Sequence, residues 1–236
     1  MVCGQMFEMK EGFALNRLKL LTMSDIPTEE VQWLWYPYLP RGKITIIQGD
    51  PGEGKTTFVL ALAALLTCGL PMPGGAESLP PMNIIYQTAE DGLADTVKPR
   101  LTALGADCSR VLVIDESERE LTLSDHRIAQ AIQETDAGLL VLDPIQAYLG
   151  EGVDMHRANE VRPVFKRLGQ LAEQTGCAIV LVGHMNKMQG VKSAYRGLGS
   201  IDFRAAARSV LLVGRSKNDS ETRVAVHDKS SLAPEG

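Results

Sequence analysis

A glycine-rich turn between a β-branched stretch and an aliphatic one constrains this chain more than any other feature. Residues 49–56 read Gly-Asp-Pro-Gly-Glu-Gly-Lys-Thr and fit the spacing G-x-x-x-x-G-K-[ST]. Residues 43–48 before the turn are rich in isoleucine, and residues 56–67 after it are rich in alanine and leucine. Glycines let successive N–H groups point at one anion, and the following helix adds its N-terminal dipole. The sequence therefore predicts a strand–turn–helix unit that holds phosphate.

The motif assigns an expected role to each of its residues. Lys55 is expected to reach the β- and γ-phosphates of ATP, and Thr56 to offer its hydroxyl to Mg²⁺. The residues expected to line the nucleotide are Gly49, Asp50, Pro51, Gly52, Glu53, Gly54, Lys55, Thr56 and Thr57. A glycine turn beside a surface lysine is the simpler alternative, but the flanking strand and helix patterns argue against it.

A series of short apolar runs has the composition of buried strands. These runs cover residues 43–48, 83–87, 111–114, 139–142, 177–182, 209–213 and 223–226. Continuous apolarity, without alternation, is typical of strands covered on both faces. Helical patterns alternate with the runs, as over residues 159–175, where the apolar residues form one stripe. The sequence therefore predicts an α/β fold with a mostly parallel, doubly wound sheet and helices on both faces.

The composition is that of a globular chain. Of 236 residues, 44% are hydrophobic and 22% charged, which argues against disorder. We expect residues 1–40 to form a flanking segment that packs on the core, and residues 41–236 to form the α/β domain. The longest apolar run, residues 58–66, falls far short of the roughly 20 residues of a membrane helix, and residues 1–11 do not resemble a secretory signal. Because the cysteines also form no C-x-x-C pair, we expect a cytoplasmic protein.

Acidic residues follow two of the predicted strands, at the place where sheets of this class bind their ligands. Asp143 is expected to hold Mg²⁺ through water, although an aspartate at this place can also simply cap a turn. Pro144 follows and cannot act as a base, so the base that activates water must come from another strand. Glu90 is the first candidate for that catalytic base, and Asp91 competes with it. Either acid can alternatively do no more than cap the helix expected over residues 92–104.

A histidine follows the strand expected over residues 177–182. We expect His184 to contact the γ-phosphate region and to report the loss of that phosphate to the next loop, with Asn186 as a weaker companion. A lone histidine at a strand end is often only a packed residue, and that alternative remains open.

The stretch from residue 187 to residue 208 has a local excess of positive charge in a chain of net charge −5. The glycines and the lack of periodicity over residues 187–200 predict a surface loop. Cations and an aromatic ring in such a loop suit single-stranded nucleic acid, through phosphate contacts and base stacking. The residues expected to make these contacts are Lys187, Lys192, Tyr195 and Arg196. A merely solvated surface loop is the alternative.

The order of these motifs resembles one family. The chain is similar to RecA-like P-loop ATPases of the DnaB/RepA hexameric helicase group, and most of all to the RepA-type branch of AAA-family ATPases. The resemblance extends from about Trp33 onward, and the motif order ends with residues 196–201. Its more specific segments are residues 88–92, 183–187 and 207–211.

The resemblance implies a ring, usually of six subunits, with ATP and Mg²⁺ between neighbours. It implies the same roles for the acids and the histidine as given above. It also implies a cation supplied to the γ-phosphate of the neighbouring subunit. Arg208 and Lys229 match candidate positions for this cation, and Arg204 is a further candidate.

The implied function is an ATP-driven motor that acts on single-stranded DNA in replication, as helicases do. One alternative is a recombination or repair mediator of the RecA/RadA kind. Another is a nucleotide-gated assembly or signalling ATPase without DNA activity, similar to circadian-clock ATPases. Members of the DnaB/RepA group usually continue beyond the position of residue 236 into another strand, so we expect this chain to be a shortened form.

Overall fold

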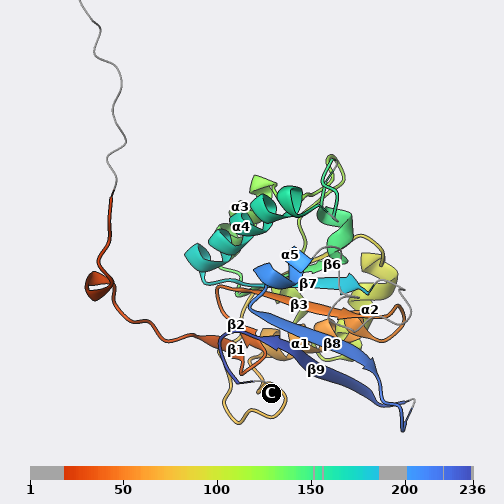
Figure 1. Ribbon diagram of the computed structural model, residues 1–236. Helices are drawn as coiled ribbons and strands as arrows, with labels where there is room; N and C mark the ends of the chain where they lie inside the picture. Colours follow the sequence, from red (N-terminus) through yellow and green to blue (C-terminus); the bar gives the residue numbers. More distant parts are fainter. Residues whose placement is uncertain (1–18, 151, 156, 186–200, 220, 235–236) are drawn as a thin grey trace, which may run out of the picture. The chain divides into compact units, whose positions relative to one another are not determined.

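The computed structural model describes residues 19–150, 152–155, 157–185, 201–219 and 221–234 (Figure 1). The chain divides into two compact units, Met1–Glu30 and Val31–Gly236. Among the described residues of the first unit, a 3-10 turn at Met23–Asp25 is the only regular element, and residues 19–30 are all exposed. The unit boundary divides the flanking segment expected over residues 1–40, and the packing of its first 30 residues stays a prediction.

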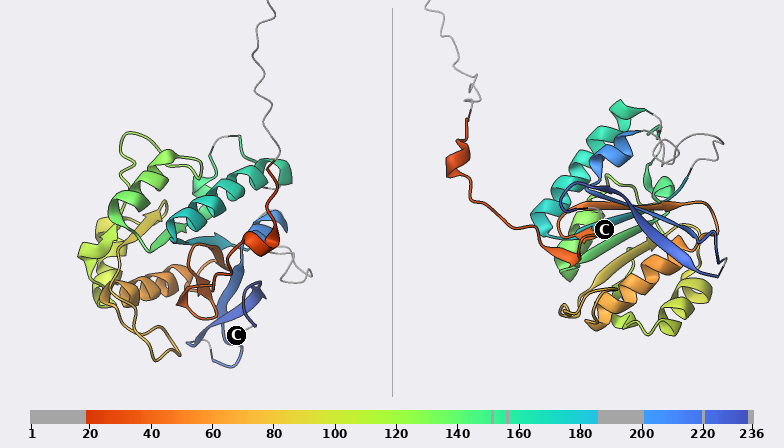
Figure 2. Two further views of the ribbon diagram at one scale, coloured as in Figure 1. Left: turned by 90° about the vertical axis from the view of Figure 1, so that its left-hand side faces the viewer. Right: turned by 60° about the horizontal axis from the view of Figure 1, so that its bottom comes forward.

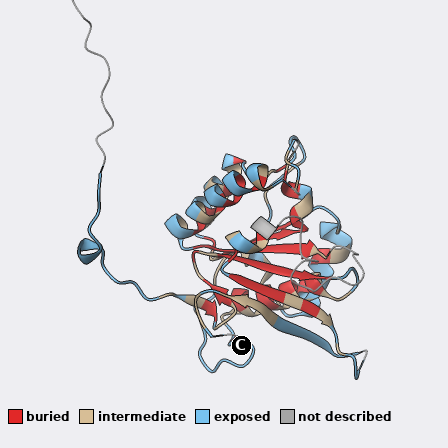
Figure 3. Cartoon of the chain, viewed as in Figure 1, coloured by how far each residue is buried: buried red, intermediate tan, exposed pale blue. Residues whose placement is uncertain are grey.

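Within the described residues, seven strands form the main sheet of the second unit in the order β5-β4-β6-β7-β3-β8-β9. They are β3 (Ile44–Gly49), β4 (Ile84–Thr88), β5 (Val111–Leu112), β6 (Leu139–Asp143), β7 (Ala178–His184), β8 (Ser209–Arg215) and β9 (Arg223–Ser230). All neighbours pair in parallel except β8 and β9, which form an antiparallel hairpin. The central strands β6, β7 and β3 are buried along nearly their whole length (Figure 3). The predicted mostly parallel α/β sheet is confirmed.

Helices cover both faces of this sheet. The helices are α1 (Lys55–Cys68) and α2 (Lys98–Ala103) on one face, and α3 (His126–Thr135), α4 (Ala158–Thr175) and α5 (Ile201–Ala206) on the other (Figures 1 and 2). One cluster of buried apolar side chains fills the space on each face. The helix expected over residues 92–104 begins as a π-helical turn, Leu93–Val97, and continues as α2.

Strand β9 differs from the expectation of strands covered on both faces. Val224 and Val226 are 40% and 50% exposed (Figure 3). The reason is position, because β9 lies at the edge of the sheet and pairs with β8 alone. A short apolar run predicts a strand, but it does not predict how deeply that strand lies in the sheet.

Residues 31–40 belong to the second unit and pack on the face that carries α1. They include a small antiparallel pair, β1 (Trp33–Trp35) and β2 (Leu39–Pro40). Leu34, Trp35 and Leu39 are buried in the same cluster as the side chains of α1. In the described part of the chain, no helix is long and apolar enough to cross a bilayer.

The parallel arrangement brings the carboxyl ends of four strands together. Gly49 at the end of β3 lies opposite His184 at the end of β7, and Thr88 at the end of β4 lies opposite Asp143 at the end of β6. The segments that leave these strands therefore meet at one edge of the sheet.

Candidate active site

The turn between β3 and α1 has a backbone that only glycine suits. Gly52 and Gly54 have φ angles of +79° and +90°, in the left-handed region. A Cβ atom on Gly49 would overlap the carbonyl oxygen of Val213 on the neighbouring strand. Gly54 precedes α1 without a side-chain cap, so the first N–H groups of the helix are left for another acceptor. An anion at this place would accept hydrogen bonds from these N–H groups and would be stabilised by the helix dipole.

Lys55 lies folded within this phosphate loop. Its side chain is buried, and Nζ donates to the carbonyl oxygens of Gly49 at 3.0 Å and Asp50 at 2.9 Å. Burial lowers the pKa of Lys55, while the negative charges of Asp143, Asp50, Glu90 and Glu53 oppose that shift. The amine thus sits among carboxylates at the loop, where a phosphate oxygen can replace the carbonyl acceptors.

The carboxylate of Asp143 joins three elements. Its Oδ2 atom accepts hydrogen bonds from Thr56 Oγ1 at 2.7 Å and from Tyr86 OH at 3.0 Å. Burial raises the pKa of Asp143, and these two hydrogen bonds act in the opposite direction because they favour the charged form. The pKa of Tyr86 is also raised, first by burial and then by Asp143, so its hydroxyl keeps its proton and acts as donor.

The same geometry fits a magnesium ion. The Thr56 hydroxyl donates its hydrogen bond to Asp143, which leaves the lone pairs of the hydroxyl oxygen for a cation. Carboxylate and hydroxyl oxygens beside a phosphate site are the ligands that Mg²⁺ prefers. A buried carboxylate whose pKa is raised by desolvation also gains from a nearby positive charge.

Glu90 and Asp91 differ in what they contact. Glu90 Oε1 lies 3.7 Å from His184 Nε2, and its side chain is 64% exposed. Asp91 instead accepts a hydrogen bond from Arg100 Nη1 on α2 at 2.9 Å. The segment is held beside β6 because the N–H of Ala89 donates to the carbonyl of Asp143. Glu90 therefore contacts the end of β7, whereas Asp91 contacts α2.

His184 lies between Glu90 and the phosphate loop. It is the last residue of β7, and the N–H of the next residue, Met185, donates to the carbonyl of Gly49 at 3.2 Å. Its Nδ1 atom is buried and has no hydrogen-bond partner among the described residues. Asn186 lies outside the described residues, as do Lys187, Lys192, Tyr195 and Arg196, so their expected contacts stay predictions.

Arg208, Lys229 and Arg204 lie at the opposite edge of the sheet. The N–H of Arg208 donates to the carbonyl of Ile44, where β3 begins. Lys229 Nζ donates to the carbonyls of Arg204 and Ala207, both at 2.7 Å, and so caps the end of α5. Arg204 pairs with Asp228 of β9. The structure does not bring these cations to the phosphate loop of their own chain, and a role toward a neighbouring subunit stays a prediction.

Two other arginines lie at the phosphate loop, although the sequence alone does not single them out. Arg215 Nε is 3.5 Å from Glu53 Oε1, and the Arg223 side chain lies beside Gly54, with Nε 3.8 Å from the position of a Cβ there. The two arginines face each other across the β8–β9 hairpin. Only the pairing of β8 with β3 could have located them. The sequence does not single out Tyr86 either. Its only signal is a hydroxyl inside a buried apolar run, which needs a hydrogen-bond partner.

Comparison with known proteins identifies the family. Residues 15–190 match the model of the AAA_25 family, described as an AAA domain. DNA repair protein RadA of Bacillus subtilis is 29% identical over 149 residues, which are 62% of this chain and 29% of that protein. RadA of Pseudomonas aeruginosa is 30% identical over 188 residues, 75% of this chain and 37% of that protein. The chain thus spans less than two fifths of the length of these relatives. The matched family, together with the parallel sheet and phosphate loop, shows that the chain belongs to the AAA_25 family of RecA-like P-loop ATPases.

Proposed function

We propose that this chain hydrolyses ATP in a Mg²⁺-dependent reaction and couples hydrolysis to single-stranded DNA. The observation that carries the enzymatic part is the hydrogen bond of 2.7 Å between Thr56 and Asp143. It joins the phosphate loop to the end of β6, beside the segment that carries Glu90. A merely structural glycine turn would not need a buried carboxylate at this place.

In the proposed reaction, the loop N–H groups and Lys55 bind the β- and γ-phosphates. Mg²⁺, when bound at Thr56 and Asp143, supplies positive charge that offsets the phosphate charge. Glu90 orients a water molecule and accepts its proton while the water oxygen bonds to the γ-phosphorus. The bond from that phosphorus to the bridging oxygen breaks, and the electron pair stays on ADP. The proton on Glu90 then passes to solvent, for which its exposed side chain is suited.

His184 is proposed to act as the sensor of the γ-phosphate. Nε2 of His184 faces Glu90, and His184 lies three residues before the basic stretch. Loss of the γ-phosphate would therefore move His184 and, through it, the start of that stretch. We propose that Lys187, Lys192, Tyr195 and Arg196 then contact single-stranded DNA, by phosphate contacts and base stacking.

Two cellular uses of this chemistry are proposed. One is a ring-forming, helicase-like motor in replication, with six subunits and with Arg208, Lys229 or Arg204 acting on the neighbour's nucleotide. The other is a repair or recombination ATPase. The similarity to proteins named DNA repair protein RadA supports this second use as much as the first. The local charge of the basic stretch suits both uses.

The test is the rate of ATP hydrolysis against the concentration of single-stranded DNA at two salt concentrations. We expect stimulation that weakens at the higher salt, because phosphate contacts release counterions. A forked DNA duplex then separates the two uses, since a motor unwinds it and a mediator binds it without strand separation. Hydrolysis that ignores DNA, together with an oligomer that depends on nucleotide, would instead support an assembly or signalling ATPase.

A further inference from the structure

The carboxylate of Asp143 is held from two sides. Thr56 donates from the phosphate loop and Tyr86 from the neighbouring strand β4, and both hydrogen bonds end on Oδ2. Within the described residues, Oδ1 receives no side-chain hydrogen bond, and Asp143 as a whole is 7% exposed. The hydroxyls of Thr56 and Tyr86 together therefore hold Oδ2 of this buried carboxylate on the side of the protein.

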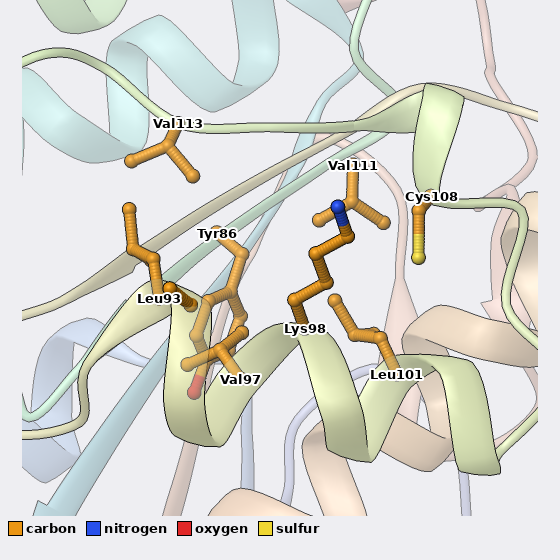
Figure 4. A pocket seen from close by; sticks show the side chains of 9 residues that line it. Tyr86, Leu93, Val97, Lys98, Leu101, Cys108, Val111 and Val113 are labelled. Atoms are coloured by element: carbon orange, nitrogen blue, oxygen red, sulfur yellow. The ribbon is translucent and has the colours of Figure 1, made fainter.

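Tyr86 is itself held rigidly. The residue is fully buried, and its ring belongs to the cluster that contains Val97 and Leu101. The ring also forms part of the wall of a cavity of about 380 Å³, and Figure 4 shows the hydroxyl pointing away from Lys98 and Val111. The ring packing thus directs the hydroxyl to Asp143 and not to solvent.

We propose that Tyr86 is a positioning residue for the metal site, one that keeps Oδ2 of Asp143 engaged and leaves Oδ1 to Mg²⁺ or to a water bound to it. The inference rests on the proposed Mg²⁺-dependent reaction and adds a residue that the phosphate-loop motif does not contain. Tyr86 touches neither the nucleotide nor the metal in this role, because it acts through Asp143.

A physical consequence follows for cation binding. Without the Tyr86 hydroxyl, a buried carboxylate keeps Thr56 as its remaining side-chain donor. Its charge is then less well stabilised and its orientation less restricted. Loss of a hydrogen-bond partner of a metal-binding carboxylate costs roughly 10- to 100-fold in metal affinity. Binding of nucleotide without metal, which depends on the loop and Lys55, should not change.

The test compares Tyr86→Phe with Tyr148→Phe. Tyr148 is equally buried and lies five positions after Asp143, and its hydroxyl has no hydrogen-bond partner among the described residues. The Mg²⁺ concentration for half-maximal tightening of a fluorescent ADP analogue is measured by direct titration, alongside binding in EDTA. We expect Tyr86→Phe to raise that Mg²⁺ concentration about tenfold or more. We expect unchanged binding in EDTA, and no change of either quantity in Tyr148→Phe.

Three results would overturn the role of Tyr86: an unchanged Mg²⁺ requirement in Tyr86→Phe, an equal shift in Tyr148→Phe, or equally weakened binding in EDTA. A double-mutant cycle gives a second check, in which Tyr86→Phe with Asp143→Asn is compared with Asp143→Asn alone. The two should then have the same Mg²⁺ requirement, and a difference would contradict action through Asp143. The proposed function fails separately, when the unmodified chain neither binds nucleotide more tightly with Mg²⁺ nor hydrolyses ATP.

Discussion

His184 Nε2 lies 3.7 Å from Glu90 Oε1, so the end of β7 meets the segment after β4 beside the phosphate loop. Burial is the main cause of the raised pKa of Asp143 and of the lowered pKa of Lys55, and the negative charge of Glu90 adds to the first shift and opposes the second. Strand β7, which leads into the basic stretch, therefore contacts the proposed catalytic base through His184.

Glu90→Gln should retain ATP binding and lose turnover by about 100-fold or more, because an amide cannot accept the proton of water. Single-turnover hydrolysis together with nucleotide binding checks this. Asp91→Asn is the matched control, since Asp91 faces Arg100 on α2, and we expect near-normal turnover from it. The reverse pattern would assign the base to Asp91.

Lys55→Ala should abolish tight ATP binding, because the loop loses the cation that lies among its carbonyl groups. Equilibrium binding of a fluorescent ATP analogue measures the loss. Lys43→Ala serves as control, since Lys43 forms a partly exposed ion pair with Glu173 away from the loop. Equal binding by both variants would rule out the proposed phosphate contact.

Gly49→Ala should destabilise the fold by about 1–3 kcal/mol and weaken nucleotide binding, because the added methyl group overlaps the carbonyl of Val213. Gly214→Ala on β8 is the control, since a Cβ at Gly214 meets nothing within 4 Å. Urea unfolding of the two variants gives the comparison. Similar midpoints would mean that the turn accommodates a side chain.

Asp125→Ala should lower the free energy of unfolding by about 3 kcal/mol, because its buried carboxylate caps α3 and binds Arg127 and Arg119. The pKa of Asp125 lies below its usual value, mainly because Arg127 donates hydrogen bonds to the carboxylate. A lowered pKa in the folded state means stability that is present above the unfolded pKa near 3.9 and is lost as the pH falls through the folded pKa. The difference between the unmodified chain and Asp125→Ala should therefore shrink in acid, and a constant difference would contradict this account.

Lys229→Ala should lower the free energy of unfolding by about 1 kcal/mol, because the end of α5 loses the ammonium that binds its carbonyl groups. Thermal or urea unfolding measures the change. Burial, and then the positive charges of Arg204 and Arg208, lower the pKa of Lys229. The unfolded chain therefore binds this proton more tightly than the folded chain, and the contribution of Lys229 to stability rises as the pH increases through the lowered pKa. Arg208→Ala provides the contrast, because the Arg208 side chain is exposed and its loss should leave stability unchanged. A large loss of turnover in Arg208→Ala alone would assign the cation that acts on the neighbour to Arg208.

Local sequence was sufficient wherever one segment carries its own signal. The phosphate loop needs glycines for its backbone and a following helix for its dipole, and both requirements are written in residues 49–67. The continuous apolar runs likewise predicted the parallel sheet. A strand that is covered by helices on both faces is apolar at every position and does not alternate apolar with polar residues. Parallel topology then placed Glu90, Asp143 and His184 at one edge, as the end of each run indicated.

Contacts between segments far apart in the chain were not predictable in this way. The Tyr86–Asp143 hydrogen bond spans two strands, and the approach of Arg215 to Glu53 depends on β8 lying next to β3. The contacts of the Lys229 ammonium with the end of α5 likewise depend on the β8–β9 hairpin, and its role toward a neighbouring subunit stays a prediction.

The sequence by itself determined the fold class and the phosphate loop, since hydrophobic periodicity and glycine geometry act over a few neighbouring residues. Only the tertiary structure decided which donors hold Asp143, which acid contacts His184 and which arginines lie beside the phosphate loop. The physical reason is that hydrogen bonds and ion pairs act over a few ångströms, and strand order alone sets which distant residues come that close.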